Sequence, residues 1–155
     1  MEELKLYPAW KHAVAKLLES GLTYGGSVSK AQIAELCGLR VPETIKEKES
    51  FDLQMVAFTT EIRQSLLHEH NMLMAPNWDG SYRIISPSDQ TSYAIDKGVK
   101  AIAKEMRQMS AGLKHIDTAA LTDDERRKNS DAKAKLSMLY GMQKTARKEL
   151  RQISG

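Results

Sequence analysis

The stretch from Ser27 to Leu39 constrains the fold more than any other part of the chain. Ser29 is a good N-cap, because its hydroxyl can accept a hydrogen bond from a free backbone N–H of the first helical turn. Ile33 and Leu36 fall on one face, and Gly38 supplies the left-handed residue that ends a helix. So short a helix buries little apolar surface by itself. The segments before and after it must therefore complete a small core.

A helix is predicted on each side of this stretch. Residues 8–22 carry apolar side chains at helical spacing, and a turn at 23–27 leads into the short helix. Residues 38–49 read as a charged loop, after which Ser50 is expected to cap a third helix that ends near His68. The stripe of this third helix that faces a core consists of Phe51, Met55, Phe58, Ile62 and Leu66.

A β-hairpin follows the third helix. Its predicted strands are residues 71–76 and 81–85, and Asp79-Gly80 between them is a strong turn signal. With this order of elements, residues 8–86 resemble a winged helix-turn-helix domain of the bacterial or phage type, with a wing tip at 77–81. The resemblance implies a DNA-binding domain, in which the third helix enters the major groove and the wing contacts a neighbouring groove or phosphate.

The second half of the chain shows two seams in which residues alternate at spacings of four and three. The first seam consists of Ile95, Val99, Ile102, Met106, Met109, Leu113 and Ile116. The second consists of Ala132, Leu136, Leu139, Gln143, Ala146, Leu150 and Ile153. This spacing is typical of coiled-coil packing. Because the connector at 117–121 is short and a capping box at 122–125 restarts the helix, the sequence predicts an antiparallel two-helix hairpin.

These patterns predict a mainly α protein, with a winged helix domain over residues 1–87 and a helical hairpin over 88–155. Because a two-helix hairpin is marginal alone, it must dock on the first domain or pair with a second copy. We expect a homodimer, which would bury the seams and double the contact with DNA. Whether the hairpin packs within one chain or exchanges between two stays open. The expected dimerisation residues are Ile95, Val99, Ile102, Met106, Met109, Leu113, Leu136, Leu139 and Leu150.

Charge divides unevenly between the two halves. Residues 1–85 hold nine Lys or Arg and eleven Asp or Glu, a net charge of −2, whereas residues 86–155 hold fourteen and nine, a net charge of +5. Such an asymmetry of charge suggests that the two halves of the chain have different roles. No apolar run approaches the ~20 residues that cross a bilayer. The acidic first five residues show no secretory signal, so a cytoplasmic location is expected.

Few residues suggest a catalytic, phosphate-binding or metal-binding role. There is no glycine-rich phosphate loop, and the acid pairs, such as Asp123-Asp124, fall in solvated turns where a catalytic carboxyl is not expected. The His-rich spot 68–70 lacks the cysteines and the fourth ligand that structural zinc favours. The single Cys37 excludes an internal disulfide framework. We therefore expect no enzymatic activity, no metal and no cofactor.

The candidate DNA-binding residues lie on the third helix, the wing and the C-terminal helix. Gln and Arg can read base edges, Thr can contact a base or a phosphate, and basic stripes can follow the phosphate backbone. These residues are Lys48, Ser50, Gln54, Thr60, Arg63, Gln64, Trp78, Arg83, Lys144, Arg147, Lys148 and Arg151. The expected partner is double-stranded DNA, and the expected function is that of a small bacterial or phage regulator.

A protein-interaction module, an inhibitor or adaptor built on a winged-helix scaffold, is the alternative. The net negative first half supplies little of the counterion release that dominates affinity for DNA. On the third helix, Glu61 would repel phosphates, and an outward Leu53 suits contact with protein. The DNA sequence, the identity of a protein partner and the biological process are not encoded in any recognisable motif.

Overall fold

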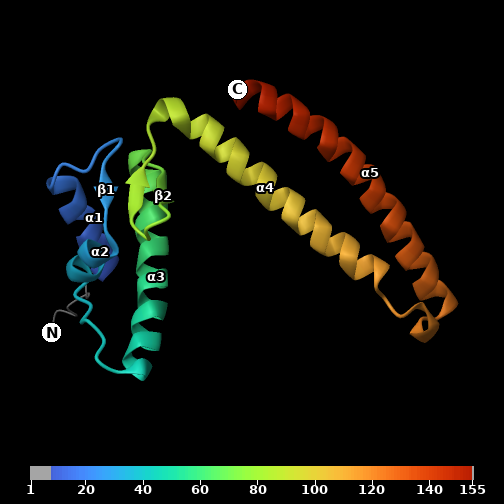
Figure 1. Ribbon diagram of the computed structural model, residues 1–155, viewed down its shortest axis with the longest axis horizontal. Helices are drawn as coiled ribbons and strands as arrows, with labels where there is room; N and C mark the ends of the chain where they lie inside the picture. The colour runs from blue at the N-terminus through green and yellow to red at the C-terminus, as the bar shows by residue number, and fades with distance from the viewer. Residues whose placement is uncertain (1–7, 155) are drawn as a thin grey trace, which may run out of the picture. The chain divides into compact units, whose positions relative to one another are not determined.

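The computed structural model describes residues 8–154 (Figure 1). The acidic first residues, on which the expected cytoplasmic location rests, lie outside the described residues. The chain is mainly helical, with one small three-stranded antiparallel sheet, and it divides into one unit up to Ser88 and another from Asp89. Across residues 8–154, no helix is both long enough and apolar enough to span a membrane.

The first unit combines three helices with the sheet. Its elements are α1 (Ala9–Glu19), β1 (Ser27–Val28), α2 (Lys30–Leu36), α3 (Ile45–His70), β2 (Met74–Pro76) and β3 (Tyr82–Ile84). The strand order is β1-β3-β2, and Val28 lies opposite Tyr82 while Met74 lies opposite Ile84. The predicted hairpin is β2 and β3. The sequence pattern does not predict β1, because a strand of two residues shows no periodicity.

The predicted short helix is confirmed as α2. Ser29 Oγ accepts from the backbone N–H of Gln32 at 3.1 Å, and Gln32 Oε1 accepts from the backbone N–H of Ser29 at 2.8 Å. This capping box satisfies two backbone donors that a helix start otherwise leaves free. After the helix, Gly38 adopts a left-handed φ of 69° and turns the chain away.

The start predicted for the third helix is wrong. The helix begins at Ile45, because Thr44 rather than Ser50 is its N-cap. Thr44 Oγ1 accepts from the backbone N–H of Glu47 at 3.2 Å, and Glu47 Oε2 accepts from the backbone N–H groups of Glu43 at 2.9 Å and Thr44 at 3.3 Å. This reciprocal box satisfies more backbone donors than a lone serine would, so Ser50 lies inside the helix.

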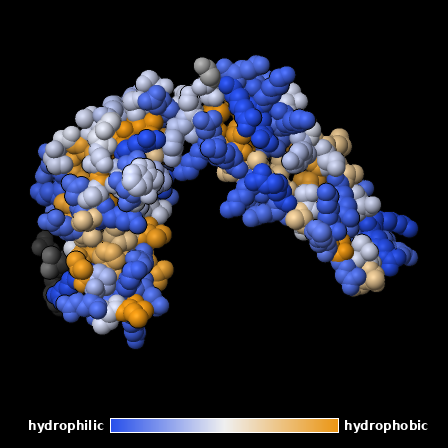
Figure 2. Space-filling model, viewed as in Figure 1, coloured by the Kyte–Doolittle hydropathy of each residue, from blue (hydrophilic) through white to orange (hydrophobic). Residues whose placement is uncertain are grey.

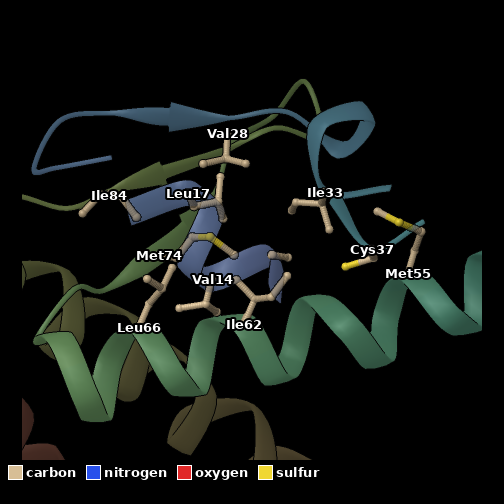
Figure 3. Close-up of a cluster of buried hydrophobic side chains, with 11 residues drawn as sticks. Val14, Leu17, Val28, Ile33, Cys37, Met55, Ile62, Leu66, Met74 and Ile84 are labelled. Atoms are coloured by element: carbon tan, nitrogen blue, oxygen red, sulfur yellow. The ribbon is translucent and has the colours of Figure 1, made fainter. Parts of the chain in front are cut away.

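The core of the first unit lies between α3 and the other elements. Figure 3 shows Met55, Ile62 and Leu66 pointing from α3 toward α1, α2 and the sheet. The predicted stripe of α3 is confirmed, with Phe51 and Phe58 only half-buried at its margin. Residues 45–50 are exposed, so the first turns of α3 extend beyond the core. The buried residues of the hydrophobic cluster are Ala13, Val14, Leu17, Val28, Ile33, Cys37, Met55, Ile62, Leu66, Met74 and Ile84.

The second unit consists of two long helices. They are α4 (Pro87–Lys114) and α5 (Asp123–Ser154), joined by a connector with the 3₁₀ turn η1 (Thr118–Ala120). The helices run antiparallel: Ser92 Oγ near the start of α4 donates to the carbonyl of Ser154 at the end of α5, at 3.3 Å (Figure 1).

The predicted capping box at 122–125 is confirmed at the start of α5. Glu125 Oε2 accepts from the backbone N–H of Thr122 at 2.8 Å, and Thr122 Oγ1 accepts from the backbone N–H of Glu125 at 3.3 Å. The two hydrogen bonds from Thr122 lower the pKa of the Glu125 carboxyl below its ordinary value, because they stabilise the ionised form.

Candidate nucleic-acid interface

Three of the candidate residues on α3 lie together beside β2. Thr60, Arg63 and Gln64 line a shallow depression of about 250 Å³ that also includes residues of the β2 segment. Arg63 Nε donates to the carbonyl of Met74 at 3.1 Å, which holds this half-buried side chain against β2. Thr60 Oγ1 donates to the carbonyl of Val56 at 2.8 Å, one turn back on the same helix. These three residues therefore form one outward-facing polar group.

The other candidates on α3 lie elsewhere on the helix. Ser50 and Gln54 line a depression of about 570 Å³ against the loop that follows Gly38. At 100° per residue, Gln54 is about 120° around the helix from Thr60. Lys48 is exposed in the turns that extend beyond the core. The structure thus separates the α3 candidates into two groups.

The outward face of α3 is apolar in its first half. Leu53 is 73% exposed and Val56 is 67% exposed, and both lie on the side that Thr60 shares one to two turns later. Ile45 and Val41 are exposed near the helix start. Figure 2 shows orange patches at the surface around the beginning of α3, the region to which these exposed residues belong. The predicted outward position of Leu53 is confirmed.

The turn between β2 and β3, where the sequence predicts the wing tip, is tight and internally bonded and carries an exposed tryptophan. Asp79 accepts from the hydroxyl of Ser81 at 2.6 Å and from its backbone N–H at 2.9 Å. These two hydrogen bonds lower the pKa of the Asp79 carboxyl. Trp78 is 99% exposed at the tip, so it contributes nothing to the core and is free to contact a partner.

Two basic side chains flank this predicted wing. Arg83 is exposed on the central strand β3, and Lys30, from the start of α2, lies beside Gly80 at the wing turn. A Cβ atom placed on Gly80 would lie 3.5 Å from Lys30 Cε. Sequence reasoning missed Lys30 because the turn and α2 are distant in sequence. No local signal could have brought the two together.

The four candidate residues of the C-terminal helix lie together on the second unit. Lys144, Arg147, Lys148 and Arg151 line a depression of about 720 Å³ with Tyr140. Tyr140 also lines a second depression of about 740 Å³ between α4 and α5. The basic residues there are Arg107 and Lys114 of α4 and Lys133 of α5. We call the surface formed by Arg107, Lys114, Lys133, Lys144, Arg147, Lys148 and Arg151 the basic groove.

Within the described residues, the side chains of the basic groove take no part in the ion pairs that the structure shows. Among residues 8–154 the ion pairs are Lys16 with Glu19 and Arg126 with Asp123, and none of these residues belongs to the groove. In the same described range, Arg147 Nε is a buried donor without a hydrogen-bond acceptor. A groove lined by seven basic side chains attracts an anionic ligand.

The predicted seams divide into buried and exposed members. Val99, Met106 and Leu136 are buried between α4 and α5, together with Ala103, which was not in the predicted seam. Ile95 and Leu113 are half-buried. In contrast, the remaining members of the expected dimerisation set are exposed; they are Ile102, Met109, Leu139 and Leu150.

The described potential metal ligands do not cluster, and the single thiol is buried. No cluster of three or more His, Cys, Asp or Glu residues arranged to hold a metal ion occurs within residues 8–154. Cys37 is buried in the core of the first unit, and burial raises the pKa of its thiol. A thiol in that environment packs as a small apolar group.

No family model, curated protein or solved structure matches the chain.

Proposed function

We propose that the protein binds double-stranded DNA, as a small regulator of the bacterial or phage type, through a winged helix and the basic groove. The element order of the first unit supports the winged helix, because a strand precedes the second helix and pairs with the last strand beyond the third helix. That order leaves a wing between β2 and β3 and one face of α3 outward. The outward polar group of Thr60, Arg63 and Gln64 supplies hydrogen-bonding side chains suited to base edges.

The observation that most supports this proposal is the basic groove. Duplex DNA binds proteins largely by releasing counterions from its phosphates, and each phosphate contacted adds to the salt dependence of binding. The first unit has a net negative charge and therefore supplies little of this counterion release. The groove supplies phosphate contacts from seven basic side chains arranged along two helices. In this proposal, the groove provides most of the affinity for DNA, and α3 and the wing provide the preference for particular DNA sequences.

A salt titration tests the groove. Fluorescence anisotropy with a labelled ~30-bp duplex should show log K falling linearly with log salt, with a slope of about −0.9 per phosphate contacted. The double substitution Lys144→Ala with Lys148→Ala should weaken binding on the order of tenfold at low salt and make the slope shallower by about two contacts. The matched control, Lys128→Ala with Lys135→Ala, removes the same charge from the same helix outside the groove, and it should leave the slope near the wild-type value. Equal effects of the two pairs would refute a role for the groove, and absence of binding to any duplex would refute the function.

A second candidate function, binding to a protein, is favoured by the exposed Leu53 and Val56 on the same outward face of α3. The two functions make opposite predictions for Leu53→Glu. If α3 enters a DNA groove, the added carboxylate should weaken binding to duplex by tenfold or more, whereas Ala15→Glu on the exposed side of α1 should not. If that face binds protein, Leu53→Glu should leave binding to DNA unchanged. Selection from random duplexes, compared between wild type and Gln64→Ala, measures the sequence preference itself.

A further inference from the structure

The helical hairpin keeps a continuous apolar face exposed. On α4, Ile102 and Met109 are 50% and 54% exposed, and Ile116 follows seven residues later. On α5, the exposed apolar residues on the corresponding side are Leu139, Met142, Leu150 and Ile153. We call these seven residues the apolar face. Its spacing, close to 3.5 residues over several turns, is that of helices that pack along their length.

These residues lie on one side of the hairpin. Val99 and Met106 mark the direction in which α4 faces α5, and at 100° per residue Ile102 and Met109 lie about 60–80° to one side of it. Leu136 marks the corresponding direction on α5, and Leu139 lies about 60° from it in the same rotational sense. Because the helices run antiparallel, equal rotations place both sets on the same side.

The basic groove lies on the opposite side. Relative to the same directions, Arg107 on α4 and Lys144 on α5 are rotated by about 80° the other way. The depressions that define the groove confirm this placement, since they include Arg107, Lys144 and their neighbours but none of the seven residues of the apolar face. The hairpin therefore has one apolar and one basic side.

The size of the face suits a stable dimer. Its seven side chains each expose on the order of 100 Å², so about 700 Å² of each copy would be covered, close to the ~800 Å² per partner of a standard interface. A patch of several hundred Å² of exposed apolar surface is also typical of an interaction site.

We infer that the apolar face binds the apolar face of a second copy of this chain, which gives a dimer with four helices at its centre. The inference does not depend on DNA binding. It accounts for the exposed members of the heptad seams, whereas the buried members, Val99, Met106 and Leu136, hold each hairpin together. The two basic grooves would remain uncovered.

The mass of the protein in solution tests the inference. Sedimentation equilibrium of the full chain of 17.4 kDa should give about twice that mass at micromolar concentration. Ile102→Asp with Leu139→Asp should raise the dissociation constant at least 100-fold, while the helical circular dichroism signal is retained, because both side chains are exposed within one hairpin. The matched control, Gln108→Asp with Thr145→Asp, places the same charges on the outer sides of α4 and α5 and should leave the mass doubled.

Cross-linking locates the interface without disturbing it. In a Cys37→Ser background, Met142→Cys should form a disulfide-linked dimer readily under mild oxidation, and Thr145→Cys should not. A wild-type mass of one chain at 100 micromolar or above would overturn the inference. So would a dimer that the Ile102 and Leu139 substitutions leave intact, because its interface would lie elsewhere. If the wild-type protein is a monomer and these substitutions lower its melting temperature, the apolar face makes contacts within the chain and the inference is wrong.

Discussion

Replacing Ile62 with alanine should unfold the first unit far more readily than any change on the outward side of the same helix. Ile62 is fully buried at the centre of α3, where it faces α1 and the sheet (Figure 3). The substitution removes three carbon atoms, worth about 2.4 kcal/mol at ~0.8 kcal/mol each. If roughly half of the vacated ~80 Å³ stays open, the cavity adds about 1 kcal/mol, so the expected loss of stability is about 3–4 kcal/mol.

Urea denaturation measures this loss. Trp10 packs against the core and reports unfolding by fluorescence, whereas Trp78 is exposed and is best replaced by phenylalanine in every sample. The control Leu53→Ala removes a side chain of the same size from the exposed face of α3, and it should change the unfolding free energy by less than about 0.5 kcal/mol. A loss below about 1 kcal/mol for Ile62→Ala, or equal losses at both sites, would refute the placement of the core.

Three further changes test local features of the fold. Thr44→Ala should cost about 1 kcal/mol in urea denaturation because it removes the N-cap of α3, whereas Ser50→Ala should be close to neutral; the reverse order would restore the start predicted from sequence. Gly38→Ala should cost about 1 kcal/mol in the same assay, because only the left-handed backbone opposes it and no atom lies within 4 Å of the new Cβ. The lowered pKa of Glu125 means that its stabilisation of α5 is present above the ordinary glutamate pKa of 4.5 and is lost as pH falls through the folded-state pKa. The difference in thermal stability between wild type and Glu125→Gln should therefore shrink when circular dichroism melts at pH 6 are compared with melts at pH 3.

Elements that depend on short-range signals could be predicted from the sequence. The capping box of Ser29 and the left-handed Gly38 lie within ten residues of each other, and together they fix α2. The start of α3 was missed because its apolar stripe begins only at Phe51. The turns from Ile45 to Ser50 lie beyond the core, so hydrophobic periodicity carries no information about them.

Features that depend on contacts between distant residues could not be predicted. β1 exists because Ser27 and Val28 pair with β3, more than fifty residues later. In the hairpin, the heptad spacing identifies the apolar residues but not which of two overlapping faces meets the other helix. The structure turns α4 so that Ala103 faces α5 and Ile102 does not. The candidate interface shows the same division: the basic stripe of α5 is local and was found, but Arg107, Lys114 and Lys133 join it only through packing.

The single cysteine gives the chain a built-in chemical probe. Cys37 is buried in the first unit, and the hairpin has no thiol. A small thiol reagent can therefore react only when the first unit opens, so the rate of labelling measures that opening. Opening of the second unit does not contribute to the rate, because that unit has no cysteine. A duplex or protein that binds the first unit should slow the labelling, whereas a ligand confined to the hairpin should not. The same natural residue thus tells which half of the molecule a ligand occupies.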